Sequence, residues 1–101
     1  MNNRVIEVVT FKLNKGVSEE EFLKTVPASS EFVATLDGFI SRRLSCDNEG
    51  NWLEHVEWES LAYAEAAAEE FMKVEDIKPF INMIDMSNTK MSHNRLLVSV
   101  Q

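Results

Sequence analysis

Residues 4–21 read RVIEVVTFKLNKGVSEEE, and this stretch decides the fold because a strand, a turn and a helix start follow one another directly. Residues 4–13 are rich in β-branched and aromatic side chains, which favour a strand. The Asn-Lys-Gly sequence at 14–16 ends that strand. Ser18 and Glu21 have the spacing of a capping box, in which each side chain accepts a hydrogen bond from the other residue's backbone N–H. The stretch therefore predicts a strand followed by a helix.

The segment after Ser18 predicts an amphipathic helix that ends at Gly38. With Ser29 filling one gap, its apolar side chains recur at spacings of three and four: Phe22, Val26, Val33 and Leu36. Pro27 lies inside the segment, and a proline in mid-helix costs about 3 kcal/mol because it removes a backbone hydrogen bond and clashes with the preceding turn. We therefore expect a kink or a short break there. Gly38 can adopt the left-handed conformation that ends a helix.

A hairpin and a second helix follow. Residues 39–46 and 52–59 are predicted strands, and the Asp-Asn-Glu-Gly sequence at 47–50 is a turn of the kind that joins a hairpin. Ser60 is a suitable cap for a helix that continues through good helix formers to Lys73.

Two further elements complete the chain. Residues 76–84 predict a short helix with Pro79 in its first turn, where the missing N–H does little harm. Residues 92–100 predict a fourth strand. The order β-α-β-β-α-β over one domain, residues 1–101, predicts an α+β fold of the ferredoxin-like split type. Its helices would cover one face of a four-stranded antiparallel sheet.

The uncovered face of this sheet is also predicted to be apolar. In the first strand Val5, Val9, Phe11 and Leu13 share a face with Glu7, while the other face carries Ile6, Val8 and Thr10. A solvated face would alternate to polar residues. We therefore expect a homodimer in which two open sheet faces meet, a dimeric α/β barrel. The alternative is a monomer that tolerates an apolar patch.

Composition disfavours several kinds of partner. Ten Lys and Arg against seventeen Asp and Glu give a net charge of −7, which disfavours nucleic acids and anionic membrane surfaces. The single cysteine, Cys46, has no partner for an intramolecular disulfide and lies beside Asp47, which does not favour a thiolate. The sequence shows no signal peptide and no apolar run of membrane-spanning length, so we expect a cytoplasmic protein.

Motifs along nearly the whole chain resemble a known family. They are FKLNKG at 11–16, Gly38-Phe39, Arg42-Arg43, the turn at 47–50, Trp58-Glu59-Ser60, and Phe71-Met72 in the Ala-rich helix. From about residue 4 to residue 100 the sequence resembles the antibiotic-biosynthesis-monooxygenase-like proteins of the dimeric α/β barrel superfamily. The resemblance implies a homodimer.

For some members the resemblance also implies oxidation of aromatic polyketide quinols by dioxygen without metal or flavin. Other members resemble haem-degrading monooxygenases, and many have no assigned activity. Trp58 matches a family tryptophan that lies against the pocket. The characterised quinol oxidases have an asparagine four residues before it, whereas this chain has Glu54. The Asn-Trp-His set of the haem-degrading members is not reproduced, because the first strand has no asparagine in its interior.

Strand parity suggests where chemistry would occur. Trp52, Glu54, Val56 and Trp58 share one face of the third strand. If the face of Phe11 meets the helices, Glu7 joins Glu54 and Trp58 in a pocket within the monomer. A carboxylate among apolar walls holds its proton more tightly. Such a group is suited to take a proton from a phenol or quinol, after which the phenolate reacts with dioxygen.

The candidate residues follow from this arrangement. Catalytic candidates are Glu54, Trp58 and His93, the last as an acid, a base or a haem ligand. Ligand-binding candidates are Glu7, Phe11, Tyr63 and Met72. The methionines Met72, Met83, Met86 and Met91 are expected to pack the core or line an adaptable pocket. Structural roles compete with each assignment: Trp58 as a core anchor, the glutamates as rim residues, and His93 as a hydrogen-bonded strand residue.

Three functions remain open. The first is a monooxygenase-like protein that needs no cofactor and acts on a small aromatic or quinol ligand. The second is a haem-binding or haem-degrading protein that uses His93 or His55, although parity places His55 opposite Trp58. The third is a ligand-binding module without activity. No nucleotide, flavin, acyl-transfer or metal-binding motif is present, and Arg42 and Arg43 are expected to form surface ion pairs.

Overall fold

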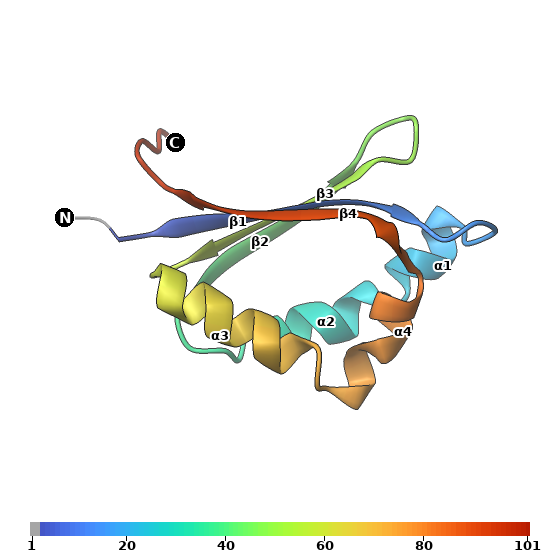
Figure 1. Ribbon diagram of the computed structural model, residues 1–101, viewed down its shortest axis with the longest axis horizontal. Helices are drawn as coiled ribbons and strands as arrows, with labels where there is room; N and C mark the ends of the chain where they lie inside the picture. Colours follow the sequence, from blue (N-terminus) through green and yellow to red (C-terminus); the bar gives the residue numbers. More distant parts are fainter. Residues whose placement is uncertain (1–2) are drawn as a thin grey trace.

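Four strands form one antiparallel sheet, and the helices pack on one of its faces (Figure 1). The structure is a computed structural model that describes residues 3–101. The strands are β1 (Val5–Leu13), β2 (Phe39–Cys46), β3 (Trp52–Trp58) and β4 (Ile84–Arg95). Their order is β2-β3-β1-β4, so β1 lies inside the sheet and pairs with β3 and β4. The predicted α+β, ferredoxin-like arrangement is confirmed.

The helices are α1 (Glu19–Leu23), α2 (Val26–Val33), α3 (Leu61–Phe71), the 3₁₀ helix η1 (Glu75–Ile77) and α4 (Lys78–Asn82). The helices α1 and α3 begin directly after the predicted caps, Ser18 and Ser60. The Ser18 Oγ accepts a hydrogen bond of 3.1 Å from the Glu21 N–H, and the Ser18 N–H donates to Glu21 Oε1, which completes the capping box. The predicted break occurs just before Pro27, which lies in the first turn of α2, where it is harmless.

The last third of the chain departs from the prediction. Residues 76–84 do not form one helix: η1 and α4 divide the segment, and β4 begins at Ile84. The fourth strand therefore covers residues 84–95 and not residues 92–100. Its length is set by β1, which it follows from Leu13 opposite Ile84 to Val5 opposite Arg95. Beyond that point β1 has ended, and a strand without a partner has no ladder to join.

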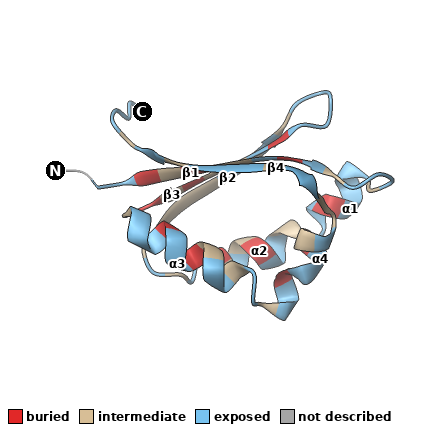
Figure 2. Cartoon of the chain, in the orientation of Figure 1, coloured by how far each residue is buried: buried red, intermediate tan, exposed pale blue. Residues whose placement is uncertain are grey.

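The core consists of two apolar clusters between the sheet and the helices (Figure 2). The first contains Val5, Val33, Val56, Trp58, Ala64 and Ala67, and the second contains Phe11, Phe22, Trp52, Ile77 and Phe80. Phe22 is fully buried, with its ring centroid 4.9 Å from that of Trp52 and 5.0 Å from that of Phe80. Burying such a side chain contributes about 1.5–3 kcal/mol. Phe71 packs against both clusters and so joins them.

Gly38 ends the segment after α2 in a conformation that few other residues adopt. Its φ is +83°, and its carbonyl oxygen accepts a hydrogen bond of 2.8 Å from the Glu59 N–H. A Cβ atom at this position would collide with the side chain of Tyr63, which lies directly against the glycine. Tyr63 therefore has a packing role at the start of α3.

We predict that Gly38→Ala destabilises the protein by about 1–3 kcal/mol more than Gly16→Ala, because the added methyl overpacks against Tyr63. Gly16 has a similar φ of +89° but nothing within 4 Å of the Cβ position, so it isolates the backbone strain. Urea unfolding of the two variants measures the difference. Equal losses of stability would show that the contact with Tyr63 carries no cost.

Candidate functional site

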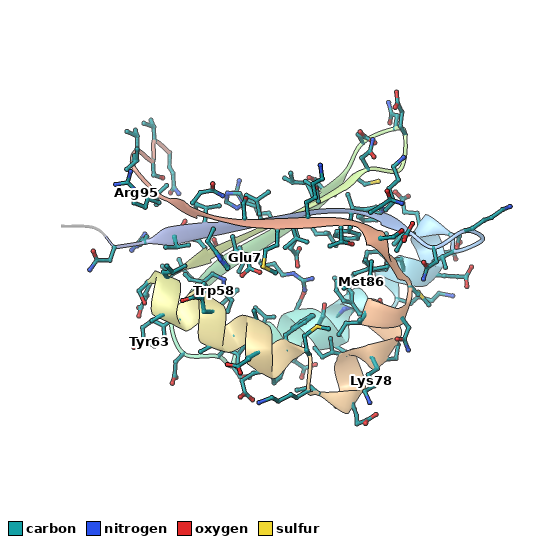
Figure 3. All side chains as sticks on the ribbon, viewed as in Figure 1. Glu7, Trp58, Tyr63, Lys78, Met86 and Arg95 are labelled. Carbon is teal, nitrogen blue, oxygen red and sulfur yellow. The ribbon has the colours of Figure 1, made fainter. Side chains whose placement is uncertain are left out.

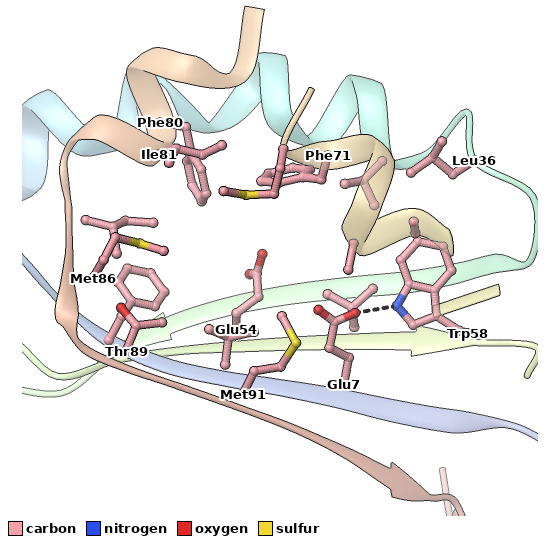
Figure 4. Close-up of a pocket in the computed structure, with 18 residues that line it drawn as sticks. Glu7, Leu36, Glu54, Trp58, Phe71, Phe80, Ile81, Met86, Thr89 and Met91 are labelled. Atoms are coloured by element: carbon pink, nitrogen blue, oxygen red, sulfur yellow. Dashed lines mark hydrogen bonds between the residues drawn. The ribbon is translucent and has the colours of Figure 1, made fainter. Parts of the chain in front are cut away.

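A cavity of about 220 Å³ lies between the sheet and the helices, and it joins the two core clusters (Figure 4). Its volume is below the ~300–1,000 Å³ of pockets for drug-sized ligands, so it suits a small molecule. The walls are almost entirely apolar, with residues from β1, β3, α3, α4 and β4: Val9, Phe11, Val56, Phe71, Phe80, Ile81 and Ile84 among them. Thr89 and two carboxylates, Glu7 and Glu54, supply the polar groups in this lining.

The alternation of side chains along β1 and β3 brings both carboxylates into the cavity. Glu7 pairs with Val56, and Glu54 pairs with Val9, so the two glutamates are diagonal neighbours on the same face. Figure 3 shows Glu7 and Trp58 on the helix-covered side of the sheet. This is the face on which Phe11 also lies, as the parity argument required for a shared pocket.

Glu7 is held by the indole of Trp58. The Trp58 Nε1–H donates a hydrogen bond of 2.9 Å to Glu7 Oε1, and both side chains are buried. The same oxygen lies 3.9 Å from His93 Nε2. Burial raises the pKa of Glu7, and the nearby Glu54 adds to this rise, while the Trp58 hydrogen bond and His93 oppose it. Glu7 is therefore a fixed carboxyl with increased proton affinity in an apolar surrounding.

Glu54 has a different environment, because Arg42 lies beside it. Arg42 Nε donates a hydrogen bond of 2.7 Å to Glu54 Oε1, and Arg42 Nη2 lies 2.6 Å from the same oxygen. The two side chains are only 7% and 13% exposed. Burial raises the pKa of Glu54, with the contacts to Arg42 opposing the rise. The prediction that Arg42 forms a surface ion pair is therefore wrong. Arg42 lies on the face of β2 that the helices cover, and its ion pair with Glu54 is buried.

Arg42 is itself held from three directions. Its Nη1 donates to Ser29 Oγ at 2.7 Å and to Ser30 Oγ at 2.9 Å, and its guanidinium lies 5.4 Å from the ring centre of Phe80. These contacts link α2, β2, β3 and α4 at one point. A guanidinium stays protonated under all folding conditions, so its burial requires a counter-ion, which Glu54 supplies.

The other candidates divide between the cavity and the rest of the molecule. Phe11 and Met72 line the cavity, together with Met86 and Met91. Tyr63 does not line it, because the tyrosine packs on Gly38 and is 41% exposed (Figure 3). His93 contacts Glu7 from the cavity side of the sheet without being part of the lining.

The mouth of the cavity is bordered by methionines. Met72 at the end of α3 is 55% exposed, and Met86 and Met91 of β4 are 58% and 52% exposed. Flexible thioether side chains adapt to ligands of different shape. Thr89 and Ile81 are lining residues that sequence reasoning missed. The alternation of residues 89, 91 and 93 could have indicated Thr89, but the predicted fourth strand began only at residue 92, whereas β4 begins at Ile84.

Neither a known protein-family model nor a characterised protein sequence matches the chain. Several solved structures are similar to it. A mutant of SnoaB, a cofactor-independent oxygenase from Streptomyces nogalater, is 12% identical with 97% of each chain covered and a TM-score of 0.78. A candidate antibiotic biosynthesis monooxygenase from Bordetella bronchiseptica is 14% identical, with 95% of this chain and 99% of that chain covered and a TM-score of 0.72. A conserved protein from Methanosarcina mazei is 13% identical, with 93% of each chain covered and a TM-score of 0.70.

The class that these similarities define is the ferredoxin-like α+β domain with one helix-covered sheet face. Within that class the chain has the fold of the antibiotic biosynthesis monooxygenases, as the resemblance in sequence suggested. At 12–14% identity the similarity concerns the fold alone. Within residues 3–101, no helix combines the length and the apolar character needed to cross a bilayer.

We predict that Glu7→Gln stabilises the protein above pH 7. The folded protein binds the Glu7 proton more tightly than the unfolded chain, in which the carboxyl keeps its ordinary pKa of 4.5. The free energy of unfolding of the wild type therefore falls as the pH rises from 4.5 through the raised pKa. Glutamine keeps the shape and an acceptor for the Trp58 N–H but cannot ionise.

Thermal unfolding of the two proteins between pH 4 and pH 8 tests this. The advantage of the variant should be largest at the alkaline end and vanish below pH 4.5, where Glu7 is protonated in both states of the wild type. Glu54 is present in both proteins, and its charge contributes to the raised pKa of Glu7 that the variant removes. A difference in stability that is constant over the range would contradict the prediction.

Proposed function

We propose that the protein is a monooxygenase-like enzyme that needs no cofactor and oxidises a small aromatic ligand with an acidic hydroxyl group. The observation that carries the proposal is Glu7, a carboxyl of raised pKa that Trp58 holds inside an apolar cavity. A general base is most effective when its pKa lies near the pH at which the enzyme works, and burial moves the pKa of Glu7 upward in that direction. The oxygenase named among the structural neighbours has the same fold.

The chemistry balances with dioxygen as the sole co-reactant. Glu7 takes the hydroxyl proton, and the resulting phenolate carries electron density to a ring carbon that bears hydrogen. That carbon forms a bond to dioxygen, and the Glu7 proton returns to the outer oxygen to give a hydroperoxide. Loss of water breaks the O–O bond, removes the hydrogen from carbon and leaves a carbonyl. The net change is one phenol and one O₂ to one quinone and one water.

The apolar walls serve this reaction in two ways. They keep water out of the cavity, which strengthens both the hydrogen bond by which Trp58 holds Glu7 and the hydrogen bond between Glu7 and the ligand hydroxyl. They also hold an aromatic ring against Trp58 and Phe71, since ring faces and edges pack favourably. The methionine-lined mouth lets a flat apolar molecule enter.

A haem function is supported less well. Neither His93 nor His55 is a lining residue of the cavity, and His55 pairs with Val8 on the opposite face of the sheet. His93 Nε2 is directed at Glu7 Oε1, 3.9 Å away. The residues present therefore do not fit an axial ligand for haem in this cavity. A ligand-binding module without turnover remains the alternative that the experiment below distinguishes.

We expect the purified protein to consume oxygen with naphthols or anthrones at a rate above that of the spontaneous reaction. Glu7→Gln should reduce the enzymatic rate by about 10²–10⁴-fold, the usual contribution of a general base. Glu65→Gln, an exposed carboxylate on α3, is the matched control and should keep full activity. An oxygen electrode measures the rate. Uptake that Glu7→Gln leaves unchanged would refute the role of Glu7, and binding without uptake would favour the non-catalytic module.

We further propose that the uncovered sheet face packs against the same face of a second copy. The face carries Ile6 and Val8 of β1 and Leu53 of β3, and no helix of the described chain covers it (Figure 1). Past β4 the chain continues with two apolar residues, Leu97 and Val98, which are 75% and 77% exposed. Two such faces meeting about a two-fold axis would remove these side chains from water.

Light scattering after size exclusion should therefore give twice the chain mass of 11.6 kDa. Val8→Lys places a charge at the centre of the proposed interface and should shift the protein to the monomer. Glu31→Lys, an exposed substitution on α2, is the control and should remain dimeric. A wild type that elutes as a monomer at micromolar concentration would exclude the proposed dimer.

A further inference from the structure

We infer that Glu54 is a second recognition group of the cavity, which selects ligands with two separated hydrogen-bond donors, one for Glu7 and one for Glu54. The inference rests on the cavity of the proposed function but not on its oxygen chemistry. It names the ligand class as flat, mostly apolar molecules with two hydroxyl groups at non-adjacent ring positions.

The first observation is an unused acceptor atom. Glu54 Oε1 receives both contacts from Arg42, while Oε2 is buried and has no hydrogen-bond partner within residues 3–101. A buried carboxylate oxygen without a partner is costly, and native proteins leave few of them. Glu54 is a lining residue of the cavity, and Figure 4 shows its side chain directed into the space between the sheet and the helices. A ligand donor would supply the missing hydrogen bond.

The second observation is that Glu54 is suited only to accept. As the counter-ion of Arg42 it is ionised, and an ionised carboxylate has no proton to donate. Arg42 is anchored by Ser29 and Ser30, so it keeps Oε1 engaged and leaves Oε2 as the oxygen that can still accept a hydrogen bond. An ether or carbonyl oxygen placed against Oε2 would bring two hydrogen-bond acceptors together with no hydrogen between them. The position therefore discriminates a hydroxyl from its methyl ether.

The third observation is the spacing of the two carboxylates. Glu7 and Glu54 occupy diagonal positions on neighbouring strands, for which the Cα atoms lie about 7–8 Å apart. Two adjacent hydroxyl groups would share one carboxylate, whereas two separated ones reach both. The wall between them is Val9 and Val56, which gives a ligand an apolar middle.

The test is calorimetric titration without oxygen, with three probes: naphthalene-1,6-diol, 6-methoxy-1-naphthol and 1-naphthol. We expect the diol to bind about 10- to 100-fold more tightly than either compound with one hydroxyl. A hydrogen bond to a charged group usually contributes a factor of this size to affinity. In Glu54→Gln the amide oxygen faces Arg42 and the NH₂ faces the cavity. The preference for the diol over the methyl ether should then fall below threefold or invert.

Control variants separate recognition from folding. Glu59→Gln, an exposed carboxylate just after β3, should keep the full preference. Glu54→Gln could fail to fold because Arg42 loses its counter-ion. In that case the double variant Arg42→Gln/Glu54→Gln, which removes both charges, is used in its place. Loss of the diol preference in either folded variant supports the inference. It is overturned if the wild type binds the three probes within threefold of one another, binds none of them, or if the preference survives in the variant.

The outcomes also distinguish this inference from the proposed function. Selectivity for the diol in a protein that consumes no oxygen would leave the recognition by Glu54 intact and refute the oxidation. Oxygen uptake without this selectivity would support the oxidation and refute the recognition role of Glu54.

Discussion

The pairing of β1 with both β3 and β4 is the constraint on which the rest of the structure depends. It places alternate side chains of three strands on one face, and it is this alternation that brings Glu7, Glu54 and Trp58 to the same cavity. A shift of one residue in the β1–β3 register would place Glu7 and Glu54 on opposite faces of the sheet. The aromatic cluster around Phe22 and Trp52 opposes such a shift, because the inner face of β3 supplies one of its rings.

The two carboxylates of the cavity share a face but differ in electrostatics. Glu7 receives a neutral N–H from Trp58 and has His93 nearby, whereas Glu54 is the counter-ion of Arg42. Burial raises the pKa of both, but only Glu54 has a permanent positive charge in contact with it. When the environments of two titratable groups differ in this way, their roles separate into proton transfer and fixed charge. This is why we assign the base to Glu7 and recognition to Glu54.

The fold narrows the function less than the site does. One fold hosts many activities, and the solved structures that share this one include a cofactor-independent oxygenase and a conserved protein from Methanosarcina mazei. Glu54, which pairs with Arg42, occupies the position at which the sequence resemblance implied an asparagine for quinol oxidases. The chemistry of the cavity must therefore be derived from its own residues.

The sequence by itself determined the elements governed by local physics. The capping box at Ser18, the break before Pro27, the left-handed Gly38 and the cap at Ser60 all lie where the residue types require them. Strand periodicity also predicted that Glu54 and Trp58 would share a face, and that Glu7 would join them if the Phe11 face of the first strand met the helices. These features follow from interactions between residues close in the chain or from the two-residue repeat of a strand.

Only the tertiary structure decided the remainder. The fourth strand begins at Ile84, because a polar stretch joins the sheet where β1 offers it a ladder. Arg42 is buried and Tyr63 is not part of the cavity, because the position of the helices over the sheet determines which side chains are enclosed. Such outcomes depend on contacts between residues far apart in the chain, whose free energy no local pattern records.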